Sequence, residues 1–131
     1  MLRFHHTGIA AADLGELTAY VQALFPVHTI SETVFDEKQQ ASLRMLTLED
    51  GSRIELVSGP VVEKRVKKRQ FLYHTCYETL DFEKAIQMFE ARGAMMVSEP
   101  KEAILFGLRR VAFFMTELGL VELLEQEPSQ L

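Results

Sequence analysis

The sequence predicts an α+β fold in which one chain carries two copies of a module ordered strand, helix and three strands. Three observations predict it. A seven-residue segment recurs, a helical pattern follows each copy, and strand-like runs with a matching last segment follow each helical pattern. We therefore expect a single domain over residues 1–131, with a first module at 3–58, a linker at 59–71 and a second module at 72–126.

The recurring segment reads FHHTGIA at residues 4–10 and LYHTCYE at residues 72–78. The two copies superpose His6 on His74 at an offset of 68 positions. Adjacent residues of a strand face opposite sides of the sheet, so only one of the neighbours His5 and His6 can face the same side as the position equivalent to His74. The repeat selects His6, and we expect His5 to face the helix layer or an edge.

A helical pattern follows each copy, because apolar residues recur at three- and four-residue steps from Leu17 to Leu24 and from Phe82 to Phe89. The linker is expected to form a turn and a short helix. Strands are expected at residues 27–35, 42–49 and 52–58 in the first module and at residues 95–98, 103–106, 110–116 and 120–125 in the second.

The last strands of the two modules carry one glutamate each in an apolar setting, Glu55 and Glu122. His6 lies 49 positions before Glu55, and His74 lies 48 positions before Glu122. Because strand residues alternate between faces, the apolar neighbours of Glu55 are expected to face the helix layer and Glu55 the opposite side. Each module thus offers one histidine on its first strand and one glutamate on its last.

A single glutamate in mid-strand usually lies on a solvated face, as in many antiparallel sheets. Two glutamates at matching repeat positions favour a buried site instead, and a buried carboxylate needs a cation. Imidazole and carboxylate ligands suit one divalent ion such as Co, Zn, Ni, Mn or Fe. His28 has no counterpart in the repeat and is expected at the surface. The predicted metal ligands are His6, Glu55, His74 and Glu122.

Composition and charge exclude several classes of protein. The net charge of −5 argues against nucleic acid as the main partner. No apolar run is long enough to cross a membrane, and the first residues lack the layout of a signal peptide. Cys76 is the only cysteine, so no internal disulfide can form. A reducing, cytoplasmic location is expected.

The two histidine segments, the run RVAFF at residues 110–114 and the run VELLE at residues 121–125 make the chain resemble the vicinal oxygen chelate superfamily, which includes glyoxalases, bleomycin resistance proteins and dioxygenases. The resemblance covers residues 3–126. It implies paired βαβββ modules that form an open barrel around a metal, with ligands on the first and last strand of each module. The four residues selected by the repeat stand at those positions.

Within the superfamily the chain is most similar to methylmalonyl-CoA epimerases. That resemblance implies a metal-dependent isomerase that abstracts a proton next to a carbonyl through a metal-stabilised enolate. It also implies a small-molecule substrate such as an acyl-CoA thioester, and a homodimer. The four ligands come from one chain or meet across the dimer, since both arrangements occur in the superfamily. Two alternatives stay open: a glyoxalase I-like lyase, in which Glu122 serves as both ligand and base, and a small-molecule binding or resistance protein.

The sequence departs from the epimerase pattern after the first helix. An acidic residue usually precedes a Gln-Gly pair there and is thought to act as an acid or base. Here residues 35–41 read FDEKQQA, so Lys38 occupies the acidic position if Gln39 matches the glutamine of the family. Glu37 takes that position only with a one-residue shift. The catalytic candidates are therefore Glu122 and Glu37.

The linker contains a run of basic residues, which we call the basic patch. Residues 63–70 contain these five positive charges and the negative charge of Glu63, so the segment carries a net charge of +4. We interpret it first as a solvated helix, since charge runs usually lie on solvated faces, and second as a docking patch for the phosphates of coenzyme A. The patch consists of Lys64, Arg65, Lys67, Lys68 and Arg69.

Overall fold

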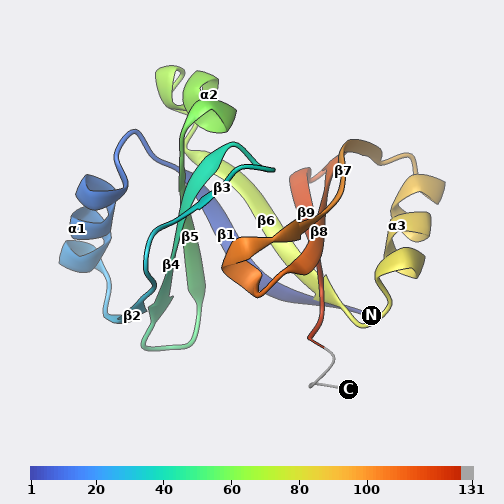
Figure 1. The fold of residues 1–131 in the computed structure, drawn as a ribbon, viewed down its shortest axis with the longest axis horizontal. Coiled ribbons are helices and arrows are strands. Elements are labelled where there is room, and N and C mark those ends of the chain that lie inside the picture. The colour runs from blue at the N-terminus through green and yellow to red at the C-terminus, as the bar shows by residue number, and fades with distance from the viewer. Residues whose placement is uncertain (128–131) are drawn as a thin grey trace. The chain divides into compact units, whose positions relative to one another are not determined.

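The computed structural model describes residues 1–127, which form nine strands, three α-helices and two short 3-10 helices (Figure 1). This is the α+β composition that the sequence predicts. In chain order the elements are β1 Leu2–Ala10, α1 Leu14–Leu24, β2 Val27–Ile30, β3 Val34–Asp36, β4 Ala41–Leu48, β5 Arg53–Ser58, η1 Pro60–Val62, α2 Glu63–Lys67, β6 Leu72–Thr79, α3 Phe82–Ala91, β7 Met95–Ala103, η2 Ile104–Phe106, β8 Arg109–Thr116 and β9 Gly119–Glu125.

The chain divides into two units, which we call the N-unit and the C-unit. The N-unit is His6–Tyr73, and the C-unit combines Met1–His5 with His74–Leu131. Both boundaries fall inside a strand, because β1 and β6 each give residues to both units. The first five residues thus group with the second half of the chain. The sequence modules at 3–58 and 72–126 stay a prediction.

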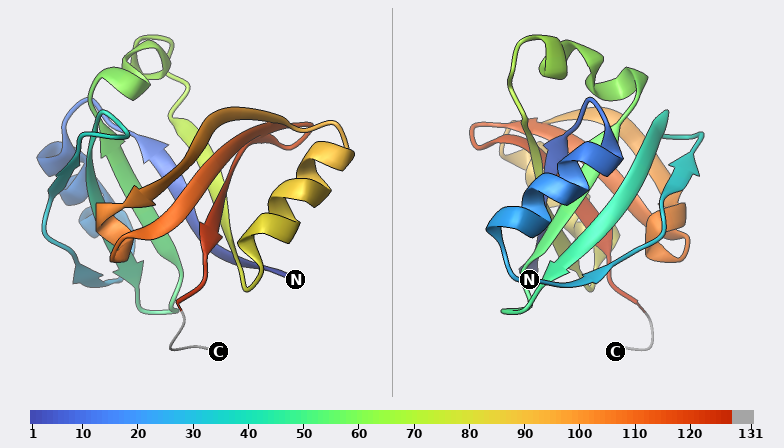
Figure 2. Two further views of the ribbon diagram at one scale, coloured as in Figure 1. Left: turned by 45° about the vertical axis from the view of Figure 1, so that its right-hand side comes forward. Right: turned by 90° about the vertical axis from the view of Figure 1, so that its left-hand side faces the viewer.

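The N-unit sheet has the strand order β2-β4-β5-β1, and β3 also pairs with β4. β1 and β5 are parallel, and the other pairs are antiparallel. α1 begins after Asp13, whose carboxylate accepts a hydrogen bond from the backbone N–H of Glu16 at 2.8 Å. The helix packs Val21 against Leu46 and Leu56 of the sheet, and Figures 1 and 2 show it lying along that face.

The C-unit sheet has the order β6-β9-β8-β7, with β6 and β9 parallel and the remaining pairs antiparallel. α3 begins after Asp81, which accepts a hydrogen bond from the N–H of Lys84 at 3.1 Å. One face of α3 packs on the sheet through a buried apolar cluster to which Leu2 of β1 also contributes. The buried members are Phe82, Ala85, Ala112, Phe114 and Leu123.

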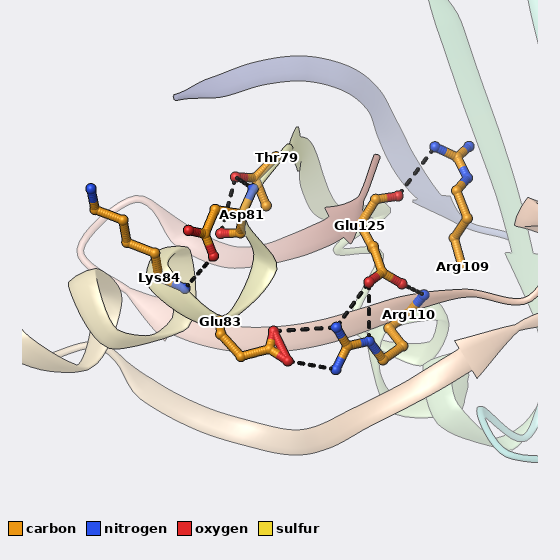
Figure 3. A network of polar contacts seen from close by, with 7 residues as sticks. All are labelled: Thr79, Asp81, Glu83, Lys84, Arg109, Arg110 and Glu125. Carbon is orange, nitrogen blue, oxygen red and sulfur yellow. Dashed lines mark hydrogen bonds and ion pairs between the residues drawn. The ribbon is translucent and has the colours of Figure 1, made fainter. Parts of the chain in front are cut away.

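Arg110 fastens the start of α3 to the sheet (Figure 3). Its guanidinium donates to Glu83 on α3 at 2.8 Å and to Glu125 on β9 at 2.8 Å, and it lies over the ring of Phe82. These two carboxylates raise the pKa of Arg110, and the hydrogen bonds from Arg110 lower the pKa of Glu125. The N-terminal turn of α3 is therefore held by a charged clamp as well as by its apolar face.

The structure corrects two expected strands. Residues 27–35 form two strands instead of one, because β2 and β3 pair with different parts of β4 and Ser31–Thr33 connects them. Residues 104–106 form a 3-10 turn that ends at Gly107 with φ +62°, because the chain must reverse between the antiparallel strands β7 and β8. The linker does form a turn and a short helix, η1 and α2. No helix among the described residues has the length and apolar character needed to span a membrane.

Candidate metal centre

The N-unit places His6 and Glu55 as a buried pair. In the parallel pairing of β1 and β5, Gly8 lies beside Glu55 and Ile9 beside Leu56. Leu56 packs beneath α1, so Glu55 and the even-numbered residues of this part of β1 project from the opposite face. His6 Nε2 lies 3.4 Å from Glu55 Oε1, and the two side chains are 0% and 4% exposed.

The C-unit repeats this arrangement with His74 and Glu122. β6 and β9 are parallel, with Cys76 beside Glu122 and Tyr77 beside Leu123. Leu123 packs in the cluster beneath α3, so Glu122 and the even-numbered residues of β6 project from the other face. His74 Nε2 lies 3.1 Å from Glu122 Oε1, and each side chain is 1% exposed.

The donor atoms of each pair fit two adjacent ligands of one divalent ion. Bonds of about 2.1 Å from a metal to nitrogen and oxygen separate adjacent ligand atoms by about 3.0 Å in an octahedral and about 3.4 Å in a tetrahedral arrangement. The observed separations are 3.4 and 3.1 Å. Burial adds a second argument, because a carboxylate without water needs a positive partner. Each pair therefore has the donor types and the spacing of two neighbouring ligands of one ion.

Phe113 completes the surroundings of the C-unit pair. It lies opposite Glu122 in the antiparallel pairing of β8 and β9, so both side chains share a face of the sheet. Its ring is perpendicular to the imidazole of His74, with 5.2 Å between centroids and 90° between planes. The sequence analysis did not single out Phe113. Pairing residues 110–116 with residues 120–125 as an antiparallel hairpin would have placed Phe113 opposite Glu122.

Glu78 forms a second charged group on the same face of β6, four residues beyond His74. It accepts hydrogen bonds from Arg3 Nε at 2.8 Å and from Arg109 Nη1 at 3.4 Å. Burial raises the pKa of Glu78, but the hydrogen bond from Arg3 and the charges of His5, Arg3 and Arg109 outweigh it and hold that pKa below its ordinary value. This carboxylate is ionised and fully engaged, so its role is structural.

His5 was expected to face the helix layer or an edge, and the structure excludes the helix layer. Leu2 packs in the cluster under α3, so Arg3 and His5 point to the other face of the C-unit sheet. There the imidazole of His5 stands perpendicular to the ring of Phe106, 5.5 Å between centroids. The expectation of the helix layer was wrong because β1 leaves the C-unit after His5 and enters the N-unit at His6.

The turn between β3 and β4 contains the other catalytic candidate, Glu37. Glu37 and Lys38 are exposed, whereas Asp36 is fully buried. The carboxylate of Asp36 accepts hydrogen bonds from the N–H groups of Lys38 at 3.0 Å and Gln39 at 3.2 Å, and from Gln39 Nε2 at 2.9 Å. Asp36 thereby fixes the turn that presents Glu37 to solvent.

A family model described as the Glyoxalase/Bleomycin resistance protein/Dioxygenase superfamily matches residues 5–113. The chain belongs to this superfamily. The match begins at the first histidine segment and includes three of the four residues selected by the repeat, and Glu122 lies beyond it. The membership confirms the resemblance drawn from the sequence. A comparison with curated proteins finds no match.

Solved structures of similar shape support the same fold for this superfamily member. A methylmalonyl-CoA epimerase from Mycobacterium tuberculosis is 19% identical and aligns over 97% of this chain and 89% of its own, with a TM-score of 0.82. A Streptomyces coelicolor methylmalonyl-CoA epimerase in complex with 2-nitronate-propionyl-CoA is 21% identical over 96% of this chain and 95% of its own, with a TM-score of 0.78. At these identities the likeness shows the fold, and the reaction needs its own argument.

Proposed function

We propose that this superfamily member is a divalent-metal-dependent isomerase that moves a proton next to a carbonyl, as an epimerase does. His6, Glu55, His74 and Glu122 are the proposed ligands of a single ion. The observation that carries the proposal is the duplication of one buried histidine–glutamate pair, with donor separations of 3.4 and 3.1 Å in the two units. Equivalent positions in a repeated module are suited to one shared function.

The chemistry of the donor set supports a single ion. Two imidazoles and two carboxylates suit Co, Zn, Ni, Mn or Fe, and the two negative charges balance a divalent cation. With four protein ligands, a bound ion would still be able to accept substrate oxygens and act as a Lewis acid. An ion bound there would supply a positive charge next to the oxygen on which negative charge develops when a neighbouring proton leaves.

The residues of the chain have defined parts in such a reaction. Glu122 is the proposed proton acceptor, because a ligand carboxylate lies beside the reacting atoms. Phe113 orients His74 through its ring contact, and its apolar ring excludes water from that side of the imidazole. The burial of all four ligands keeps the proton transfer away from bulk solvent.

The proposed substrate is a small acyl thioester of coenzyme A, which is the class of ligand present in the Streptomyces coelicolor structure. The proposal includes a homodimer, drawn from the resemblance and tested by sedimentation equilibrium. It also includes a cytoplasmic location, supported by the buried single thiol of Cys76.

A glyoxalase I-like lyase is the second candidate, and the position of Glu37 favours it over the remaining alternatives. An epimerase that uses a separate acid or base needs that group in a shielded position, whereas the Glu37 side chain is exposed in the turn between β3 and β4. Proton transfer by Glu122 alone suits lyase chemistry equally well. The two candidates share the metal site and differ in the substrate.

The test combines metal analysis with solvent deuterium exchange into methylmalonyl-CoA. The wild type is expected to carry metal and to exchange the proton next to the thioester, and His74→Ala and Glu122→Ala are expected to lose both. His28→Ala is the matched control, because His28 is exposed on β2 and is expected to leave metal and exchange unchanged. Metal content equal to wild type in His74→Ala and Glu122→Ala would overturn the site. Exchange that is absent in a metal-loaded wild type, with turnover of a glutathione hemithioacetal, would favour the lyase.

A further inference from the structure

The basic patch stands out because its charges are not compensated. All five side chains lie on or just after α2, and within residues 1–127 none of them forms an ion pair with a carboxylate. Four are exposed and Arg65 is half-buried. The whole protein carries a net charge of −5, so this local positive charge is not a by-product of composition. Uncompensated like charges repel one another, and a polyanion would relieve that repulsion.

Two guanidinium groups of the patch are held in place by aromatic rings. Arg65 lies over the ring of Tyr73 at 5.1 Å, and Arg69 lies over the ring of Phe71 at 5.6 Å. A guanidinium held over an aromatic ring has less freedom than one in water, and its N–H groups can still bind a phosphate in bidentate fashion. Such prior ordering lowers the entropy lost on binding. The patch is thus more organised than a freely solvated basic helix.

The N-unit places this patch at the same end of the sheet to which β1 and β5 point. The two strands are parallel, and β5 leads through η1 directly into α2. After α2, the chain returns to β1, where Phe71 accepts a hydrogen bond from the N–H of Ala10 at 2.7 Å. Figure 1 shows α2 beyond the ends of these strands. His6 and Glu55 lie four and three residues from the strand ends Ala10 and Ser58, which corresponds to roughly 10–13 Å along a strand.

We infer that the basic patch binds the phosphates of a nucleotide-bearing thioester, the 3′-phosphate and diphosphate of a coenzyme A substrate. This inference rests on the proposed function, which places the thioester at the proposed metal ligands, His6 and Glu55 among them. The long pantetheine arm of coenzyme A separates its thioester from its phosphates. The patch is likewise separated from His6 and Glu55, since it lies beyond the ends of the strands that carry them. Charge-assisted hydrogen bonds from guanidinium and ammonium groups are the usual means of holding phosphate.

The test is calorimetric binding of three probes to the intact protein: coenzyme A, adenosine 3′,5′-bisphosphate and pantetheine, which lacks the nucleotide. Wild type is expected to bind the first two and to bind pantetheine at least tenfold more weakly. The double variant K67Q/K68Q is expected to weaken coenzyme A binding about tenfold, as the loss of two partly screened ion pairs predicts. The matched control K84Q/R92Q removes two exposed charges outside the patch and is expected to leave binding unchanged. R65Q tests the stacked guanidinium alone.

The outcomes separate this inference from the proposed function. Coenzyme A binding that is equal in wild type and in both patch variants, or no better than pantetheine binding, overturns the inference. So does an equal loss in the control K84Q/R92Q, since that indicates a general charge effect. Binding that weakens with added salt in wild type and less in K67Q/K68Q supports it. If coenzyme A binds through the patch but no deuterium exchanges into its thioesters, the proposed reaction fails and the phosphate site stands.

Discussion

The ring of Phe113 is perpendicular to the imidazole of His74, 5.2 Å between centroids, and Phe113 lies opposite Glu122 in the pairing of β8 and β9. One aromatic side chain thus contacts one proposed ligand and lies opposite the other. An aromatic edge is positive and an aromatic face is rich in electrons, so a perpendicular pair of rings is attractive and helps to fix the orientation of the imidazole. A ligand held in its binding orientation loses less entropy when a metal binds.

Phe113→Leu is therefore expected to weaken metal binding about tenfold, by removing the contact that orients His74. Competition with a chromophoric chelator measures the affinity. Phe89→Leu serves as the control, because Phe89 contacts Phe114 in the cluster under α3. Both changes are expected to lower the free energy of unfolding by about 1–2 kcal/mol. Equal metal affinity in Phe113→Leu and Phe89→Leu would show that the ring contact does not position the ligand.

Glu78→Gln is expected to destabilise the protein by about 1–2 kcal/mol at neutral pH, because it removes the carboxylate that Arg109 and the largely exposed Arg3 share. The pKa of Glu78 is lowered in the folded protein, so its stabilisation is present above the ordinary carboxylate range and is lost as pH falls through the folded pKa. The difference between wild type and variant should shrink below about pH 4. Urea denaturation at several pH values measures it.

Glu117→Gln is the control for this pH dependence, since Glu117 is exposed and forms no ion pair within the described part of the chain. It is expected to change the free energy of unfolding by less than about 0.5 kcal/mol. A Glu78→Gln effect that is constant from pH 7 to pH 3 would contradict an ionised Glu78 in the folded protein.

Glu37→Gln is expected to keep the wild-type metal content and at least half of the proton-exchange rate, because the exposed turn leaves proton transfer to Glu122. The measurement is the rate of deuterium incorporation at saturating substrate. Loss of exchange with metal retained would identify Glu37 as the acid or base after all. Lys38→Gln is also expected to keep the metal content and at least half of the exchange rate, since Lys38 is exposed in the same turn as Glu37.

Arg110→Gln is expected to loosen the first turn of α3 and to lower the free energy of unfolding by about 1 kcal/mol. The guanidinium joins Glu83 and Glu125, but it is 38% exposed, so water screens part of the interaction. Hydrogen exchange at the amides of α3 should rise in this variant. Lys84 follows Glu83 on α3 and takes no part in the clamp, so Lys84→Gln should leave the hydrogen exchange of the α3 amides unchanged. An equal rise in both variants would rule out a specific clamp (Figure 3).

The repeat made much of the fold predictable from the sequence. It placed both helices, the last strand of each module and the orientation of Glu55 away from the helix layer, because alternation along a strand is fixed by backbone geometry. The repeat did not predict that residues 27–35 divide into two strands. Their pairing with different parts of β4 is set by tertiary contacts and not by the local sequence pattern.

The candidate site was predictable to the extent that it follows the repeat. Each histidine does lie within ligand distance of the glutamate that the spacing assigns to it, 3.4 and 3.1 Å apart. Phe113 and the arginine partners of Glu78 belong to no repeat, and only strand register brings them to their places. His5 was misjudged for a related reason, because the alternation rule gives no sign of where a strand passes from one unit to another.

The most direct test of the account is the metal stoichiometry of the purified protein, measured by elemental analysis after exhaustive dialysis. One ion shared by both histidine–glutamate pairs predicts one equivalent per chain, and its loss in His6→Ala, Glu55→Gln, His74→Ala and Glu122→Gln alike. His28→Ala should keep the full equivalent. Two equivalents per chain, with each single variant losing only one, would show two independent sites. Wild-type metal content in the variants of either pair would contradict the shared site.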